Sequence, residues 1–171
     1  MQTNVLAAII AAGGIVDADV NASAGITRGK FAAPHHRKIF SAYQSIAQTI
    51  PKVTFTKVTF TSEEFDVDSV FASSAYTPTQ VGYYLIGGSC RLVTVDDMVE
   101  VILVLYKNGS PIKRIADFVS GGISMSQPSG STLVYLSSVN DYLELYVYHA
   151  SAADHDTVAG SPYTYFWGFE I

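Results

Sequence analysis

Short segments of alternating apolar and polar residues, separated by turn residues, constrain the fold of this chain more than any other feature. One face of Met98–Tyr106 is apolar, and so is one face of Asp141–His149. A period of two places successive side chains on opposite faces of a β-strand. Two further strands are predicted over Ser131–Ser137 and Tyr163–Ile171, and Asn108-Gly109 is a favoured hairpin turn. Because no helical pattern interrupts these segments, they predict an antiparallel two-sheet sandwich.

The composition changes near Ile50-Pro51, and this divides the chain into an N-terminal arm, residues 1–48, and a β-rich domain, residues 49–171. Short helices are expected in the arm over Asn4–Ala12 and Pro34–Gln48, the second because its apolar residues recur at helical spacing. Neither helix can bury its apolar face alone. The arm is therefore expected to pack on a neighbouring subunit or a larger assembly; the alternative is an arm folded back on its own domain.

Four segments of the β-rich domain carry recognisable features in a fixed order. These are a Gly-aromatic pair in Tyr76–Tyr84, a Lys-Asn-Gly turn in Leu105–Gly109, an Asp followed by alternating apolar residues in Leu136–Val147, and a Phe-x-Gly-Phe strand in Phe166–Ile171. Over about residues 52–171 the chain thus resembles the complement C1q and tumour necrosis factor-like jelly roll, except that the family's usual Gly before the Asp is Asn140, which also enters left-handed conformations. The resemblance implies an all-β, antiparallel two-sheet jelly-roll sandwich that assembles as a homotrimer and serves binding rather than catalysis.

The segment Asp141–His149 also indicates an interface from its residues alone. Its apolar positions, Leu143, Leu145 and Val147, are expected in the core, which leaves three tyrosines on the opposite face. A soluble monomer rarely exposes so many rings in one patch. The alternative is that a loop or the arm covers them. The residues expected at the trimer interface are Tyr142, Tyr146, Tyr148, Tyr163 and Phe166.

A second resemblance lies in the arm, where Ile15–Ala33 contains an Asp-Ala-Asp-x-Asn-Ala-Ser-Ala run followed by a Lys and small residues. This segment resembles the linkers of tailed-phage fibre and head-decoration proteins. Together with a trimeric head, it implies a decoration, or cement, protein on the capsid surface of a virion, whose arm binds the major capsid protein or another virion component. The expected attachment residues are Ile9, Ile10, Ile15, Val16, Phe31, His35, Arg37 and Lys38.

Motifs for catalysis, nucleotides or metals find little support. The chain has no G-x-S-x-G elbow, P-loop or G-x-G-x-x-G, and its one cysteine, Cys90, is expected to be a buried thiol; a Ser-His-Asp triad formed only in three dimensions stays open. His35 and His36 are adjacent in the sequence, so their side chains are expected to point in different directions and to form a solvated basic patch with Arg37 and Lys38 rather than a metal site. Asp154-His155-Asp156 supplies only two carboxylates for calcium. We expect no enzyme, no cofactor and no metal.

Charge and hydropathy limit the partners further. Lys+Arg 10 against Asp+Glu 15 gives a net charge of -5, so no basic field favours nucleic acid. The apolar run Val5–Val16 is interrupted by Gly13-Gly14 and is shorter than the roughly 20 residues that cross a bilayer. We expect neither nucleic acid nor a membrane as a partner.

Two alternatives to capsid decoration remain. A tail-fibre or receptor-binding tip would present distal loops around Glu63–Thr77 and Ser151–Ser161 to a cell-surface ligand. A secreted C1q/TNF-like binding module would use a stretch such as Val5–Val16, followed by Ala22-Ser23-Ala24, as a signal peptide.

Overall fold

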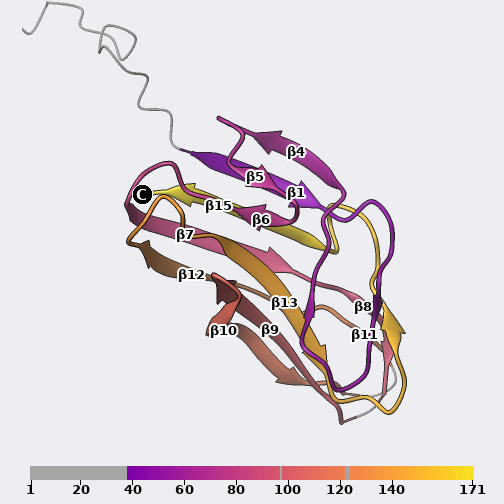
Figure 1. Cartoon of the computed structure of the whole chain (residues 1–171). Helices are drawn as coiled ribbons and strands as arrows, with labels where there is room; N and C mark the ends of the chain where they lie inside the picture. The colour runs from indigo at the N-terminus through magenta and orange to yellow at the C-terminus, as the bar shows by residue number, and fades with distance from the viewer. Residues whose placement is uncertain (1–37, 97, 122–123) are drawn as a thin grey trace, which may run out of the picture. The chain divides into compact units, whose positions relative to one another are not determined.

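The computed structural model describes residues 38–96, 98–121 and 124–171, and every regular element in these ranges is a β-strand (Figure 1). Five strands form sheet I in the order β12 (Ser129–Leu136), β7 (Gly82–Ser89), β15 (Tyr165–Glu170), β1 (Ile39–Tyr43) and β4 (Ser62–Asp66). Sheet II has the order β10 (Ser110–Val119), β9 (Glu100–Lys107), β13 (Leu143–His149), β6 (Ala75–Tyr76) and β5 (Phe71–Ala72), and β3 (Thr56–Lys57) also pairs with β13. Two small pairings join β11 (Ser124–Ser126) to β8 (Leu92–Val95) and β14 (His155–Asp156) to β2 (Thr49–Ile50). All these pairings are antiparallel, as the sequence predicts.

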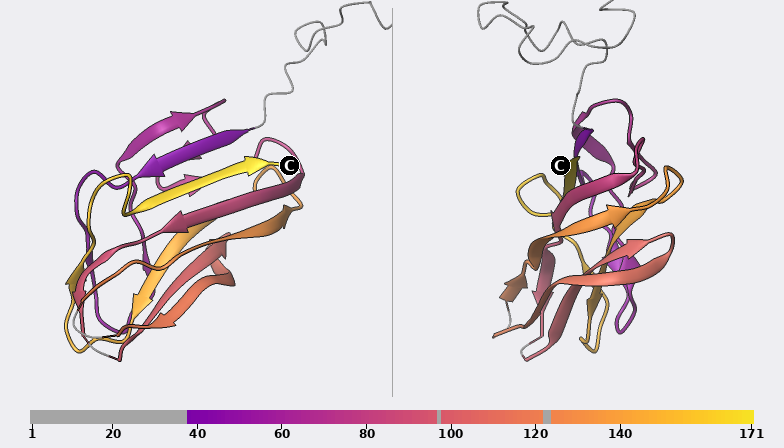
Figure 2. Two further views of the ribbon diagram at one scale, coloured as in Figure 1. Left: turned by 180° about the vertical axis from the view of Figure 1, so that it is seen from behind. Right: turned by 90° about the vertical axis from the view of Figure 1, so that its left-hand side faces the viewer.

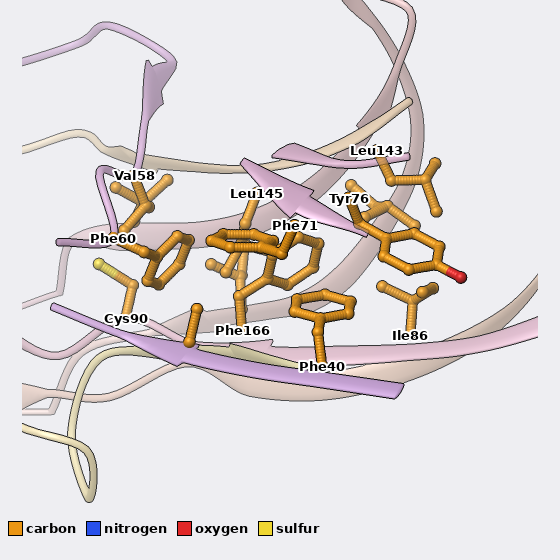
Figure 3. Close-up of a cluster of buried hydrophobic side chains, with 14 of the residues drawn as sticks. Phe40, Val58, Phe60, Phe71, Tyr76, Ile86, Cys90, Leu143, Leu145 and Phe166 are labelled. Atoms are coloured by element: carbon orange, nitrogen blue, oxygen red, sulfur yellow. The ribbon is translucent and has the colours of Figure 1, made fainter. Parts of the chain in front are cut away.

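The core lies between the two sheets and is rich in aromatic rings (Figure 3). The ring of Phe40 stacks on Phe71 and Tyr76 at centroid distances of 4.9 and 4.8 Å, and Phe166 meets Phe40 edge-on at 5.1 Å. Leu143, Leu145 and Val147 of β13 are fully buried, which confirms the predicted parity of that strand. Cys90 is a free thiol, and its burial is also confirmed.

The hairpin that joins β9 to β10 turns where the sequence predicts. Asn108 and Gly109 both have positive φ angles, 53° and 75°. Two successive positive φ values give the turn the twist that the flanking strands need, and Asn-Gly adopts them at low cost.

The helix expected over Pro34–Gln48 is wrong where the structure describes that segment, because β1 occupies Ile39–Tyr43. Phe40 and Ala42 alternate into the core, and β1 pairs with β15 on one side and β4 on the other. The apparent helical spacing ended at Ile46, which is exposed. Residues 39–43, grouped with the arm by composition, thus form a strand of sheet I. The helix expected over Asn4–Ala12 lies outside the described residues.

The described chain begins and ends at the same end of the sandwich (Figure 2). There the amide of Glu170 donates to the carbonyl of Lys38, and the amide of Val67 donates to that of Ile39. We call this the terminal end. At the far end, the amide of Gln44 donates to the carbonyl of Thr164, and that of Thr157 to Gln48. The two loop regions expected to act together in a receptor-binding tip are therefore separated, since the turn after β4 lies at the terminal end and residues 151–161 lie at the far end.

Candidate interaction surface

The outer surface of sheet I carries a continuous group of apolar side chains from all five of its strands. The pairing register aligns Ile39, Phe169, Leu85 and Leu133 across β1, β15, β7 and β12. Tyr83 pairs with Tyr135 beside this row, and their rings lie 5.0 Å apart. The inward residues of these strands fill the core, so the alternate residues must face outward. We call the following set the aromatic face: Ile39, Phe65, Tyr83, Leu85, Leu133, Tyr135, Trp167 and Phe169.

Several members of the aromatic face are strongly exposed. The exposed fractions are 62% for Tyr83, 53% for Leu133, 51% for Tyr135 and 48% for Phe65. Single exposed apolar residues are common on monomers, whereas a contiguous group is typical of an interface.

A glycine shapes the middle of the aromatic face. A Cβ atom on Gly87 would lie 2.5 Å from Cζ2 of Trp167, so the indole lies directly against the backbone of β7. Trp167 in turn stacks near Phe169 at 6.2 Å with nearly parallel rings. Gly87 therefore lets the indole lie flat across the sheet.

The aromatic face is hollowed on the side of β1 and β4. A cavity of about 330 Å³ lies there, lined by Ile39, Phe40, Ser41, Glu64, Phe65, Trp167, Gly168 and Phe169. The hydroxyl of Ser41 donates to a carboxylate oxygen of Glu64 at 2.8 Å. The face thus combines protruding rings on β7 and β12 with an apolar hollow, rimmed by an acid, on β1 and β4.

Three of the tyrosines expected at the interface, Tyr142, Tyr146 and Tyr148, lie on the opposite side of the sandwich, outside sheet II. Tyr146 stacks on Tyr106 at 3.8 Å, and Tyr148 stacks on Phe55 at 4.8 Å. Tyr142, Tyr146 and Tyr148 are half-buried by neighbours of their own chain. The stacking of Phe55 on Tyr148 agrees with the alternative that a loop covers this ring. The role of these tyrosines in an interface stays a prediction.

Phe166 needs a correction. Its side chain is fully buried in the core, so it has no surface to offer another subunit (Figure 3). The reason is parity, because Tyr165, Trp167 and Phe169 point outward on the same strand. Tyr163 lies at the far end, where the guanidinium of Arg91 sits 4.7 Å from its ring.

Only one of the expected attachment residues lies in the described part of the chain. Lys38 forms an ion pair with Asp68 at 2.5 Å, just before β1. The other expected attachment residues, Ile9, Ile10, Ile15, Val16, Phe31, His35 and Arg37, lie outside the described residues.

Sequence reasoning missed the most exposed part of the aromatic face. The parity of Tyr163–Ile171 could have found Trp167 and Phe169, but nothing local pairs Tyr83 with Tyr135. That juxtaposition depends on the β7–β12 register, which joins segments about fifty residues apart.

The side chains of Cys90, Asp154 and Asp156 are engaged within the fold. Burial raises the pKa of the Cys90 thiol to about 12, which keeps it protonated. Asp154 accepts a hydrogen bond from the amide of Lys52, and Asp156 accepts one from the hydroxyl of Thr49. Within the described ranges, no three His, Cys, Asp or Glu side chains gather as metal ligands. In the same ranges, no helix has the length and apolar character to cross a membrane.

The carboxylate of Asp141 is held by several hydrogen bonds and one ion pair. It accepts hydrogen bonds from the amides of Ser137 and Ser138 and from Asn108, and it pairs with Lys107 at 2.8 Å. The Lys107 ammonium, followed by the Asn108 side chain, holds the pKa of Asp141 well below its usual range. The carboxylate thus fastens the turn before β13 to the β9–β10 hairpin.

No protein-family model matches the sequence, and no curated protein matches it. Solved structures do match. The globular domain of zebrafish complement 1qA protein matches with a TM-score of 0.56 at 16% identity, over 78% of this chain and 97% of that one. Eiger TNF from S. frugiperda gives a TM-score of 0.58 at 10% identity, over 79% and 92% of the two chains. Murine APRIL gives 0.60 at 9% identity, over 79% and 99%. The β-rich part of the chain therefore has the C1q/TNF-like jelly-roll fold.

Proposed function

We propose that this chain is a non-enzymatic, homotrimeric structural protein that decorates the capsid of a tailed phage, with its subunits joined through the aromatic face. The observation that carries self-assembly is the exposure of that face. Taking about 200 Å² for a fully exposed aromatic side chain, the exposed fractions of Tyr83, Tyr135 and Phe65 leave about 320 Å² of surface. The exposed surface of these three side chains alone thus reaches the lower end of the range for the largest apolar patch of a typical monomer, which is about 300–600 Å².

The layout of the aromatic face favours a closed ring of subunits over a two-fold dimer. The protruding rings lie on β7 and β12, and the hollow lies on β1 and β4 of the same sheet. If the rings of one copy enter the hollow of the next, different surfaces meet, and such a contact closes into a ring when the rotation allows it. The resemblance to the C1q and tumour necrosis factor-like family supports three copies.

Capsid decoration rests on the arm. Residues 15–33 resemble the linkers of phage head-decoration and fibre proteins, and the described chain begins at the terminal end of the sandwich. A threefold axis makes the three copies equivalent, so all three arms start on the same side of the trimer. Three linked attachments bind far more tightly than one, because the second and third become intramolecular.

The test is a deletion that spares the first strand. Because β1 begins at Ile39, a truncation at Ser45 would destroy sheet I, whereas removal of residues 1–35 leaves the compact unit His36–Ile171 complete. We expect the shortened protein to remain a trimer by light scattering and to be absent from purified capsids after incubation with them. Full-length protein, added in parallel, should bind. Normal occupancy by the shortened protein would show that the arm is not the attachment.

A receptor-binding tail tip is the second candidate, and one observation favours it. Residues 151–161 lie at the far end, away from the start of the described chain, where a tip would meet a ligand. Copy number separates the two functions, since a cement protein covers the capsid and a tip is present only at the tail.

A further inference from the structure

A short segment, residues 49–55, is fastened over the end of β13, and we call it the strap. It pairs with β14 through Thr49 and Ile50. Beyond β2, the amide of Val53 donates to the carbonyl of His149 at 3.0 Å, and the amide of Lys52 donates to Oδ1 of Asp154 at 3.0 Å. The strap is thus tied to the β13–β14 connection at several points.

One side chain forms a further tie, and it is a histidine. Nε2 of His149 lies 3.0 Å from the carbonyl oxygen of Ile50. A carbonyl only accepts, so Nε2 carries the proton and donates it. His149 is fully buried, and its Nδ1 has no hydrogen-bond partner. The ring of His155 meets it edge-on at 5.0 Å, and Nε2 of His155 is also buried without a partner.

The strap is held in a strained conformation. Val53 has a φ of 53°, in the left-handed region that β-branched residues rarely enter, although its side chain is 62% exposed. Such strain persists only where surrounding contacts enforce it. The contacts to His149 and Asp154 are adjacent to this residue, so their loss allows Val53 to relax.

We propose that His149 is the latch of an acid-sensitive strap: protonation of its buried ring at Nδ1 releases residues 49–55 from β13. A second proton on this ring places a charge in a fully buried site that offers Nδ1 no acceptor. The charge can be solvated if the strap moves away. Phe55, which stacks on Tyr148, would move with the strap and uncover that ring.

The titratable and charged residues near His149 lie on several neighbouring segments. His155 lies on β14, Asp154 precedes it, and Asp96 follows β8, where its carboxylate accepts a hydrogen bond from the amide of Ala152. The strap contributes Lys52, and β9 contributes Glu100, whose carbonyl accepts from Ala150. Burial is the largest influence and lowers the pKa of His149; the Ile50 carbonyl opposes it, His155 adds to the lowering, and Asp154 and Asp96 oppose it.

The sign of the pH dependence follows. A histidine whose pKa is lowered in the closed state binds fewer protons there than in the open state, so acid favours opening. Above the ordinary pKa of about 6.5 the closed strap keeps its full stability. When the pH is lowered from about 7.5 to about 5, one such histidine can raise the equilibrium constant for strap opening up to about 30-fold.

Hydrogen exchange of the Lys52 and Val53 amides measures this equilibrium in the full chain. After correction for intrinsic exchange rates, their protection should fall up to about 30-fold between about pH 7.5 and about pH 5. Amides in the β7–β15 ladder serve as the internal reference. In His149→Gln the side-chain amide can still donate to Ile50 but cannot titrate, so protection should stay constant. The matched variant His155→Gln should keep the pH dependence.

Three results would contradict the proposal. The first is amide protection of the strap that does not change with pH in the natural protein. The others are a pH dependence that survives in His149→Gln, or one that disappears only in His155→Gln. If His149→Gln does not fold, an NMR titration of histidine-labelled natural protein decides. The His149 ring should become protonated only at a pH below its ordinary pKa of about 6.5, and its protonation should coincide with loss of strap protection. Protonation of His149 with the strap amides still protected would refute the proposal.

Discussion

Replacing Tyr83 and Tyr135 together by Asp should dissociate the proposed trimer. Their exposed fractions, 62% and 51%, correspond to about 230 Å² per subunit if a fully exposed ring offers about 200 Å². At about 25 cal/mol per Å², loss of this burial removes up to about 6 kcal/mol per subunit. Burial of each new carboxylate costs several kcal/mol more. Since 1.4 kcal/mol is a factor of ten, the lost burial alone can weaken association up to about 10⁴-fold, and the buried carboxylates weaken it further.

Native mass spectrometry and light scattering across a dilution series measure this change. Folding must be checked by circular dichroism, and Ile46→Asp is the control, because Ile46 is 69% exposed at the far end, away from the aromatic face. The double variant Tyr146→Asp and Tyr148→Asp tests the interface that the sequence predicts outside sheet II. A trimer that survives loss of Tyr83 and Tyr135 but not of Tyr146 and Tyr148 would refute assembly through the aromatic face.

Two further predictions concern stability. Gly130→Ala should lower the free energy of unfolding by about 3 kcal/mol or more, because its Cβ would clash with the carbonyl oxygen of Ile115. Gly121→Ala, whose Cβ would meet no atom of the described residues within 4 Å, should change the free energy of unfolding in urea by less than about 0.5 kcal/mol. Lys107 lowers the pKa of Asp141 in the folded protein. The ionised Asp141 carboxylate therefore stabilises the fold fully above about pH 3.9, and this contribution is lost as the pH falls toward the lowered pKa. The urea midpoint should therefore fall between neutral pH and about pH 3, and Asp141→Asn should shrink that fall; an equal fall in the variant would contradict the assignment.

Local patterns predicted the parts of the fold that depend on local geometry. The alternation in β13 assigned its core residues, and Asn108-Gly109 marked the hairpin, because strand parity and turn conformation are properties of a few adjacent residues. The same rule, applied to the last strand, would have placed Phe166 in the core and its neighbours outside.

Features that depend on pairing between distant segments could not be predicted in this way. Ile39 and Tyr43 are spaced as in a helix, yet pairing with β15 and β4 makes the segment a strand. The aromatic face likewise exists only because the sheet aligns side chains from separate parts of the chain. Tertiary pairing overrides local spacing in the first case and creates the surface in the second.

The position of β15 in sheet I has a consequence for how the protein is made. It lies between β7 and β1, and Phe169 pairs with Ile39, about 130 residues earlier. On the ribosome, the β12–β7 pair and the β1–β4 pair therefore remain two separate half-sheets with open edges until the last strand has been synthesised. Chains interrupted before β15 would expose those edges and the rings of Phe40 and Tyr84, and such intermediates aggregate readily. Translation must thus run almost to Ile171 before the two halves can join.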